Sequence, residues 1–351
     1  MSESNAVVYD LSIILPIYHS NGGTLKRSLS AVASQPLFDF NVEVILVFDG
    51  PEEKLPVPLL EFSARTSDIK TVTIPHSGVS AARNAGIDTA KGKWVFFLDV
   101  DDYLPDGVLN RLLNIANESE CDLLSANHSR LYSKKEILIR YYEKERTMAQ
   151  SESIDYLRDV LSVGTDQGTV WAKLFRTSFL KDHEIKFSQN LSNGEDQEFL
   201  VRFVLCHPII TLSNINCYVY VVNYNSAVRA YRQDYLNQVI ETVRRIKFDL
   251  VQARAFDRFS ETFNLYCQDR FLLLLTNWVC RYDATNGYRV RKALFSKIVH
   301  CEIFSSAIAS TRPKRMSLVR RFVIALARLN CFFAIDCIFR ARSVLHGARD
   351  K

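Results

Sequence analysis

Four short apolar runs, separated by helical segments, constrain the fold of this chain more than any other feature. They occupy residues 11–17, 42–48, 69–74 and 93–98. The run at 11–17 is continuously apolar, which indicates a strand that is buried on both faces of a sheet, and the other three also indicate strands. Residues 23–35 and 77–90, and a segment around 59–65, have helical spacing instead. This alternation predicts an α/β fold with a Rossmann-like, doubly wound, mostly parallel sheet.

The pattern changes after about residue 122. Residues 121–132 and 217–225 are typical of strands, whereas the charged segment 133–148 favours a solvated flap or a helix. From about residue 231 onward, apolar residues recur every three to four positions, as they do in amphipathic helices. We therefore predict a first domain at 1–228, with halves at about 1–122 and 123–228, and a helical C-terminal region at 229–351. The boundary is expected near 227–230.

Three carboxylates follow the fourth apolar run in "FFLDVDDYLPDG" (96–107): Asp99, Asp101 and Asp102. Like charges this close repel one another, and they resist burial unless a cation compensates them. Carboxylates at positions i and i+2 can converge on one hard divalent cation. The alternative is an acidic turn in which Asp102 caps the next helix. In a doubly wound sheet ligands bind beyond the carboxyl ends of the strands, where this cluster and Asp49 are both expected.

Further motifs recur in a fixed order along the chain. They are "SIILPIY" with Pro16 and Tyr18, "LVFDG" with Asp49, "SGVSAARNAGI" with Arg83 and Asn84, "AKGKWVFFLDVDD", "VWAKLFRTSFL" and "NGEDQEF" with Glu195 and Asp196. Together they resemble glycosyltransferase family 2, of the bacterial surface-polysaccharide type, from about residue 11 to 226. The resemblance implies the GT-A fold, with the helical remainder as an extension that matches nothing recognised.

The resemblance also implies roles for individual residues. Asp196 would be the catalytic base, with Glu195 beside it, and Asp101 would hold Mn²⁺ or Mg²⁺ with help from Asp99 or Asp102. The residues implied to contact the nucleotide are Pro16, Tyr18, Asp49, Arg83, Asn84 and Asp99. Two simpler interpretations stay open. Arg83 on its own is typical of an ion pair, and Glu195 and Asp196 would favour the first turn of any helix.

The implied activity is an inverting, metal-dependent transfer of a sugar from a nucleotide sugar, expected to be a UDP-sugar. The acceptor would be a hydroxyl of a growing surface glycan such as capsule, lipopolysaccharide or exopolysaccharide, free or lipid-linked. Two alternatives come from other classes. A sugar nucleotidyltransferase would release pyrophosphate, and a non-catalytic glycan-binding relative would keep the fold but lose a carboxylate.

The eight cysteines include no C-x-x-C pair and lie mostly in apolar surroundings. This pattern favours reduced thiols rather than disulfides or zinc ligands. The N-terminus has no basic segment followed by an apolar one, so no signal peptide is expected. No apolar stretch is long enough for a transmembrane helix. We therefore expect a cytoplasmic enzyme.

The C-terminal tail is strongly basic. Only Asp336 and Asp350 oppose its basic residues: Arg312, Lys314, Arg315, Arg320, Arg321, Arg328, Arg340, Arg342, Arg349 and Lys351. Leu318, Phe322, Ala325, Leu329 and Phe332 recur at helical spacing. Two interpretations stay open: a helix packed on the preceding helices, or an amphipathic helix that holds the protein peripherally on an anionic membrane. No nucleic-acid partner is expected.

Overall fold

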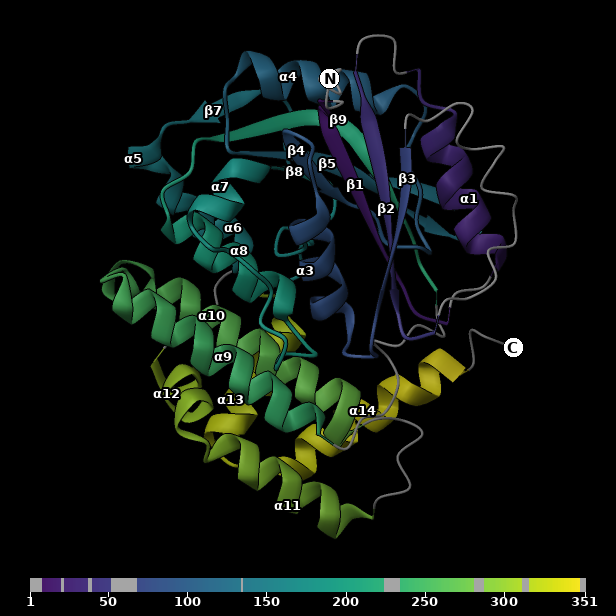
Figure 1. The fold of residues 1–351 in the computed structure, drawn as a ribbon. Coiled ribbons are helices and arrows are strands. Elements are labelled where there is room, and N and C mark those ends of the chain that lie inside the picture. The colour runs from purple at the N-terminus through teal and green to yellow at the C-terminus, as the bar shows by residue number, and fades with distance from the viewer. Residues whose placement is uncertain are drawn as a thin grey trace, which may run out of the picture. The chain divides into compact units, whose positions relative to one another are not determined.

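The computed structural model describes residues 8–19, 22–36, 40–51, 68–133, 135–223, 234–280, 287–310 and 316–347. The chain divides into two compact units (Figure 1). The first contains residues 1–156 and 169–224, and the second contains residues 157–168 and 225–351. The domain boundary predicted near 227–230 and the helix predicted around 59–65 lie outside the described residues.

A nine-stranded mixed sheet forms the centre of the first unit, in the order β3-β2-β1-β4-β8-β5-β9-β7, with β6 paired to β5 (Figure 1). Its strands are β1 (Leu11–Ile17), β2 (Val42–Asp49), β3 (Asp68–Ile74), β4 (Trp94–Phe97), β5 (Leu123–Tyr132), β6 (Lys135–Ile139), β7 (Arg146–Met148), β8 (Lys173–Arg176) and β9 (Ile210–Val221). β1 to β4 are parallel, as the four apolar runs predicted. The predicted α/β class is therefore confirmed.

The other half of the sheet contains antiparallel pairs. β8 runs antiparallel to β4 and β5, whereas β5 and β9 are parallel. The charged segment 133–148 forms β6 and β7, so a helix there was the wrong alternative. Ser133 adopts a left-handed φ of 52°, and the chain folds back there so that β6 pairs with the end of β5. The side chains of β6 are mostly exposed, including those of Ile137 and Leu138.

Helices cover both faces of this sheet. They are α1 (Gly22–Ala33), α3 (Val79–Thr89), α4 (Val108–Glu118), α5 (Gln150–Ser153), α7 (Thr177–Asp182) and α8 (Glu195–Leu205), with a 3₁₀ turn at Ile154–Tyr156 (η1). Leu29 of α1 and Leu112 of α4 share one core cluster with Ile13 of β1. α3 packs against β1 and β2. A Cβ atom at Gly86 would lie 2.3 Å from Ile14 Cγ2, so only glycine allows α3 this close to β1.

The second unit is helical, as predicted. Its helices are α6 (Leu157–Val160), α9 (Tyr235–Gln252), α10 (Phe256–Leu274), α11 (Tyr288–Val299), α12 (Glu302–Ser310), α13 (Leu318–Arg328) and α14 (Phe332–Gly347), with a π-helical turn at Leu275–Val279 (η3). α10 packs against both α9 and α12. Fully buried side chains of α10, such as Phe259 and Phe271, fill the core of this unit. None of the described helices is long and apolar enough to cross a membrane.

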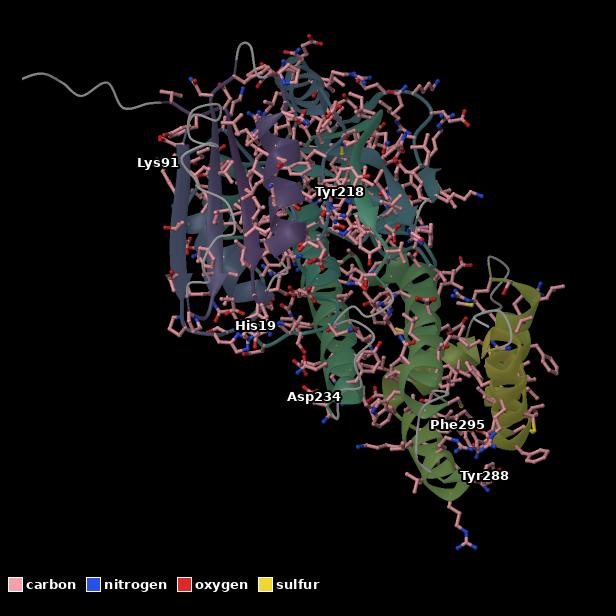
Figure 2. All side chains as sticks on the ribbon, turned by 90° about the vertical axis from the view of Figure 1, so that its right-hand side faces the viewer. His19, Lys91, Tyr218, Asp234, Tyr288 and Phe295 are labelled. Carbon is pink, nitrogen blue, oxygen red and sulfur yellow. The ribbon has the colours of Figure 1, made fainter. Side chains whose placement is uncertain are left out.

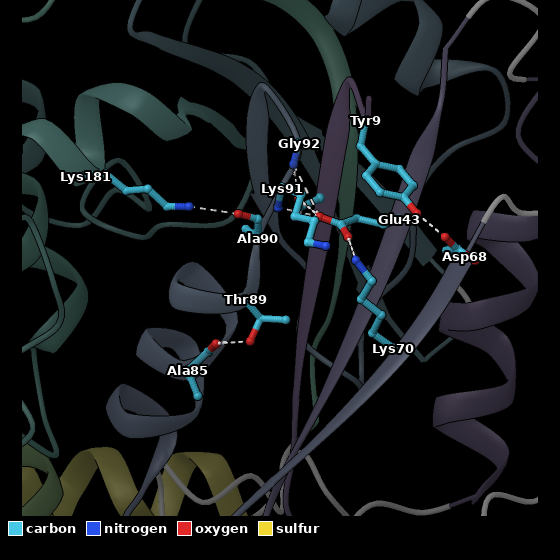
Figure 3. Close-up of polar contacts among 11 residues, drawn as sticks. Tyr9, Glu43, Asp68, Lys70, Ala85, Thr89, Ala90, Lys91, Gly92 and Lys181 are labelled. Atoms are coloured by element: carbon cyan, nitrogen blue, oxygen red, sulfur yellow. Dashed lines mark hydrogen bonds and ion pairs between the residues drawn. The ribbon is translucent and has the colours of Figure 1, made fainter. Parts of the chain in front are cut away.

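The two ends of the sheet differ in chemistry. His19, after β1, and Lys91, before β4, mark opposite ends (Figure 2). At the Lys91 end Glu43 of β2 is fully buried, and its carboxylate accepts hydrogen bonds from Lys70 Nζ (2.5 Å), the Lys91 amide (2.6 Å), the Gly92 amide and the Ser12 hydroxyl (Figure 3). Burial alone would raise the pKa of Glu43, but these bonds outweigh it and lower the pKa.

This lowered pKa predicts a pH-dependent stability. A carboxyl whose pKa is lower in the folded state stabilises the fold above its unfolded pKa, about 4.3, and loses that contribution as the pH falls toward the folded pKa. At neutral pH we expect Glu43→Gln to lower the free energy of unfolding by about 2 kcal/mol, because hydrogen bonds to a buried charge are lost. The difference from the unmodified protein should shrink at about pH 3. Urea unfolding at both pH values measures it.

Glu118→Gln provides the matched control, because Glu118 is exposed at the end of α4. It should change the free energy of unfolding by no more than about 0.5 kcal/mol at either pH. A Glu43→Gln deficit that is the same at neutral and acidic pH would show that the charge of Glu43 contributes nothing to stability.

Candidate active site

The acidic cluster lies directly beyond the carboxyl end of β4, which pairs with β1 on one side and β8 on the other. Its three carboxylates differ in exposure. The Asp99 side chain is 34% exposed, Asp101 is exposed, and Asp102 is buried at 2%. Asp99 and Asp101 therefore reach solvent at the end of the sheet where ligands were expected, whereas Asp102 points into the protein.

Asp102 is bound inside the protein by β9. Its carboxylate accepts hydrogen bonds from Tyr218 Oη (2.7 Å) and the Val221 amide (2.8 Å), and Tyr218 Oη also accepts the Asp99 amide (3.2 Å). Burial, together with the charge of Asp99, raises the pKa of Asp102 to about 8. In this structure Asp102 anchors the turn, and the metal-binding role predicted for it stays a prediction.

α1 holds the same turn from another side. The Ser28 hydroxyl donates to the main-chain oxygens of Val100 (2.8 Å) and Asp102, and the Arg27 guanidinium donates to that of Asp101. Main-chain bonds between Tyr103 and Val219 of β9 complete the attachment. The carboxylates of Asp99 and Asp101 are thus presented on a fixed backbone.

Arg83 of α3 joins this turn to the Glu-Asp motif. Its side chain is only 5% exposed, and its guanidinium lies 3.2 Å from Asp99, 2.6 Å from Asp196 and 3.6 Å from Glu195. Burial would lower the pKa of Arg83, but the three carboxylates outweigh it and raise the pKa, so Arg83 stays charged. Residues more than a hundred positions apart therefore meet in one charge cluster.

Glu195 and Asp196 form the first turn of α8, after Gly194 at a left-handed φ of 79°. Asp196 also accepts the Val170 amide at 3.3 Å, so two donors orient its carboxylate. Burial raises the pKa of Asp196, whereas Arg83 and, less strongly, Lys173 favour its ionised form. Burial and the charge of Asp196 raise the pKa of Glu195 to about 7.

A second polar group lies at the ends of β1 and β2. Asp49 is 4% exposed and accepts hydrogen bonds from the Ser77 amide (2.6 Å), the Gly78 amide (2.9 Å) and His76 Nδ1 (3.0 Å). The rings of Tyr18 and His76 are stacked, with centroids 4.2 Å apart, and more than half of each side chain is exposed. An exposed aromatic face thus lies beside a buried carboxylate.

Comparison with known proteins shows which protein family this arrangement of residues is found in. The model of glycosyl transferase family 2 matches residues 12–166, which include β1, Asp49, Arg83 and the acidic turn. The uncharacterized glycosyltransferase EpsJ of Bacillus subtilis (strain 168) is 22% identical over 96% of this chain and 98% of its own length. Residues 12–166 form a glycosyltransferase family 2 domain, and the protein is a glycosyltransferase. The resemblance found in the sequence motifs is thereby confirmed.

Two further proteins similar to the glycosyltransferase come from Staphylococcus aureus. The poly(ribitol-phosphate) β-N-acetylglucosaminyltransferase TarP of Staphylococcus aureus (strain N315) is 26% identical, over 61% of this chain and 63% of TarP, so the match covers less than two thirds of that protein. The structure of S. aureus TarS 1–349 in complex with UDP-GlcNAc superposes with a TM-score of 0.68 at 18% identity, over 97% of this chain and 92% of that one. This likeness confirms the GT-A type of fold.

The structure shows what Asn84 and Pro16 contact within the protein, and their predicted contact with the nucleotide stays a prediction. The Asn84 amide is buried and bonded to Phe187, donating to its carbonyl (2.9 Å) and accepting its amide (2.7 Å). Asn84 thereby holds the segment before α8 against α3. Pro16 lies half-buried within β1, in register with Val47 of β2 and two residues before Tyr18. Arg83, also predicted to contact the nucleotide, is the centre of the charge cluster.

Three residues of the glycosyltransferase site were not assigned from the sequence: His76, Lys173 and Tyr218. His76 follows β3 at the same edge of the sheet as Asp49. Its position beyond a strand end could have marked it as a candidate site residue. Lys173, which is buried and acts electrostatically on Asp196, belongs to the "WAKLF" motif that was noted without a role. No local pattern points to Tyr218, because its partners Asp99 and Asp102 lie far away in sequence.

Proposed function

We propose that this glycosyltransferase moves a sugar from a nucleotide-sugar donor, a UDP-sugar, to a hydroxyl of a growing surface glycan. The Arg83 cluster carries the proposal, because it joins Asp99, beside the expected donor diphosphate, to Asp196, beside the expected acceptor. TarP, named for a poly(ribitol-phosphate) acceptor, and TarS, crystallised with UDP-GlcNAc, support this class of substrates.

The donor half of the proposed site lies at Tyr18 and Asp49. An exposed aromatic ring offers a face on which a nucleobase can stack. His76 stacks on one side of the half-exposed Tyr18 ring, with the ring centroids 4.2 Å apart, and it is bonded to Asp49. In this proposal the base stacks on Tyr18, and Asp49 holds the loop that carries Ser77 and Gly78 in place through their amides.

The acidic turn fits a divalent cation of the Mg²⁺ or Mn²⁺ type. Among the described residues no group of three or more His, Cys, Asp or Glu side chains is arranged to hold a metal. Asp99 and Asp101, however, are accessible hard oxygen donors, and Mg²⁺ is usually bound by one or two carboxylates together with substrate phosphates and water. Such a cation would neutralise charge on the departing diphosphate.

Asp196 is the proposed general base. Arg83 and the Val170 amide orient its carboxylate, which would accept the proton of the acceptor hydroxyl. The acceptor oxygen then forms its bond to the anomeric carbon as the bond from that carbon to the diphosphate oxygen breaks. One such displacement inverts the anomeric configuration. Glu195, whose pKa burial raises to about 7, lies farther from Arg83, at 3.6 Å against 2.6 Å for Asp196, and is the second candidate for the same role.

The proposed reaction takes place in the cytoplasm. All eight cysteines are free thiols, and several are deeply buried, which agrees with a reducing compartment. Burial raises the pKa of the Cys217 and Cys280 thiols to about 12, so these groups are poor nucleophiles.

Thermal stabilisation by nucleotide sugars tests the donor class. At a ligand concentration about 100 times the dissociation constant, a UDP-sugar should add about 2.7 kcal/mol to the free energy of unfolding. The panel comprises UDP-, GDP-, dTDP- and CMP-sugars with Mn²⁺, and we expect stabilisation by UDP-sugars alone. Release of UDP in the presence of a glycan acceptor then measures transfer. Stabilisation by nucleoside triphosphates with release of pyrophosphate would contradict the proposal.

Tyr18 supplies the matched pair of variants for this experiment. Tyr18→Phe keeps the ring and should bind the donor as the unmodified protein does. Tyr18→Ala removes a stacking contact of about 1–3 kcal/mol and should weaken donor binding by about 5- to 150-fold. Equal binding by both variants would place the nucleobase elsewhere.

A further inference from the structure

α13 of the helical unit is apolar on two opposite faces. Val323, Ile324 and Ala327 are at most 2% exposed and attach the helix to its unit. Leu318 (78% exposed), Phe322 (56%) and Leu329 (76%) lie on the other face. The sequence allowed this apolar stripe to be either packed in a core or exposed on the surface. In the structure it is exposed. The packed side of α13 is a different set of residues.

α14 follows α13 in the chain, but its first residue, Phe332, is buried. Phe332 is 2% exposed and packs against Tyr288 and Phe295 of α11, with ring centroids 5.5 and 5.0 Å away; Figure 2 labels both α11 residues. Phe333, the next residue, is 68% exposed. The tail is therefore two helices, and Phe332 belongs to the core rather than to the apolar stripe in which the sequence analysis placed it.

The charges around the stripe are of one sign. Arg321 and Arg328 are exposed and lie seven positions apart, each one residue before a member of the stripe, so they border it along one side of the helix. Within the described side chains of residues 316–341, the only carboxylate is Asp336. It is 5% exposed and bonded to Arg291 (2.9 and 3.0 Å) and Arg340 (3.0 Å). Within the described side chains of this segment, the surface thus presents apolar groups and cations without an exposed carboxylate.

The combination of apolar side chains and arginines favours one kind of binding partner over another. In a symmetric dimer the same patch meets itself, so two copies joined through this face would place their arginines against each other. An anionic lipid surface has complementary charge and also accepts the apolar side chains. A helix of 11 residues is about 16 Å long, roughly half the hydrocarbon thickness of a bilayer, so α13 can lie in the interface but cannot cross it.

We propose that the stripe of Leu318, Phe322 and Leu329 inserts into the interfacial region of an anionic membrane leaflet, with Arg321 and Arg328 against the headgroups. The protein is then bound peripherally, through one face of one helix. The apolar side chains supply insertion and the arginines supply the preference for anionic lipid. This inference does not depend on the donor, the cation or the base of the transfer reaction.

Vesicle flotation with the full-length protein tests the proposal. One set of vesicles is phosphatidylcholine alone, and the other contains about one third phosphatidylglycerol. We expect recovery with the anionic vesicles to exceed that with neutral vesicles by about tenfold or more, and to fall at high salt. The variant Leu318→Ser/Phe322→Ser/Leu329→Ser should abolish flotation, and Arg321→Glu should remove the preference for anionic lipid.

Phe248→Ser/Val251→Ser is the matched control, because both side chains are exposed on α9 of the same unit, at 59% and 47%. It should float as the unmodified protein does. Equal recovery with neutral and anionic vesicles, or no loss in the α13 triple variant, would overturn the proposal. So would a dimer in sedimentation without lipid that disappears in the triple variant, because the stripe would then bind a second copy.

Discussion

Replacing Asp196 with Asn will lower kcat by about 10²- to 10⁴-fold and leave the affinity for the donor nearly unchanged. Asn is close to Asp in size and can keep the contact with the Val170 amide, but it cannot accept the proton of the acceptor hydroxyl. The substitution removes a group that acts in the transition state rather than in ground-state binding. Steady-state kinetics of UDP release, with donor binding measured by calorimetry, separates the two effects.

Glu195→Gln is the control for this prediction, because Glu195 is adjacent and contacts the same arginine at 3.6 Å. Its loss of kcat should be smaller. Since burial raises the pKa of Asp196, activity of the unmodified protein should fall as the pH drops through a value above that of an exposed aspartate. Normal turnover with lost donor binding in Asp196→Asn would make Asp196 a binding residue, and a larger loss in Glu195→Gln would exchange the two roles.

Asp101→Ala will abolish most of the cation-dependent activity. Polarisation of a departing phosphoryl oxygen by a metal ion stabilises the transition state by several kcal/mol, so a loss of about a hundredfold or more in kcat/KM is expected. The fold should survive, because the Asp101 side chain is exposed. The measurement is transfer activity as a function of Mn²⁺ concentration, in the unmodified protein and in the variant.

Asp106→Ala is the matched control, since Asp106 is another exposed aspartate of the same segment, five positions later. Its activity and cation dependence should equal those of the unmodified protein. Full activity of the unmodified protein in excess chelator would remove the cation from the mechanism. Equal losses in Asp101→Ala and Asp106→Ala would show a general effect of charge rather than ligation.

Local patterns predicted the parallel half of the sheet well. The four runs became β1 to β4 almost residue for residue. β1, β2 and β4 are buried, and a buried parallel strand favours a continuous apolar sequence, whereas the half-exposed β3 mixes apolar and polar residues. The pattern failed for residues 133–148, where β6 is exposed and forms by pairing with β5 after the turn at Ser133. The β6 sequence, Lys-Glu-Ile-Leu-Ile, has neither a long apolar run nor strict alternation, so pairing with β5 determines the strand.

The sequence predicted which residues belong to the site, but only some of the contacts between them. Asp99, Asp101 and Asp196 were singled out, yet the sequence did not show that Arg83 would bind Asp99 and Asp196 at once. Asp102 has the same chemistry as its neighbours, but Tyr218 of β9 draws it inward. Both outcomes depend on which distant residues the fold brings together, and spacing along the chain does not contain that information.

The attachment of the acidic turn on two sides has a thermodynamic consequence. Ser28 of α1 binds main-chain oxygens of the turn, and Tyr218 and Val221 of β9 bind the Asp102 carboxylate. Fixing the backbone of one residue costs about 1–2 kcal/mol of conformational entropy. For this turn, folding of the protein has already incurred that cost. A ligand that binds Asp99 or Asp101 therefore meets an ordered backbone, and its interaction free energy is not consumed by organising a loop.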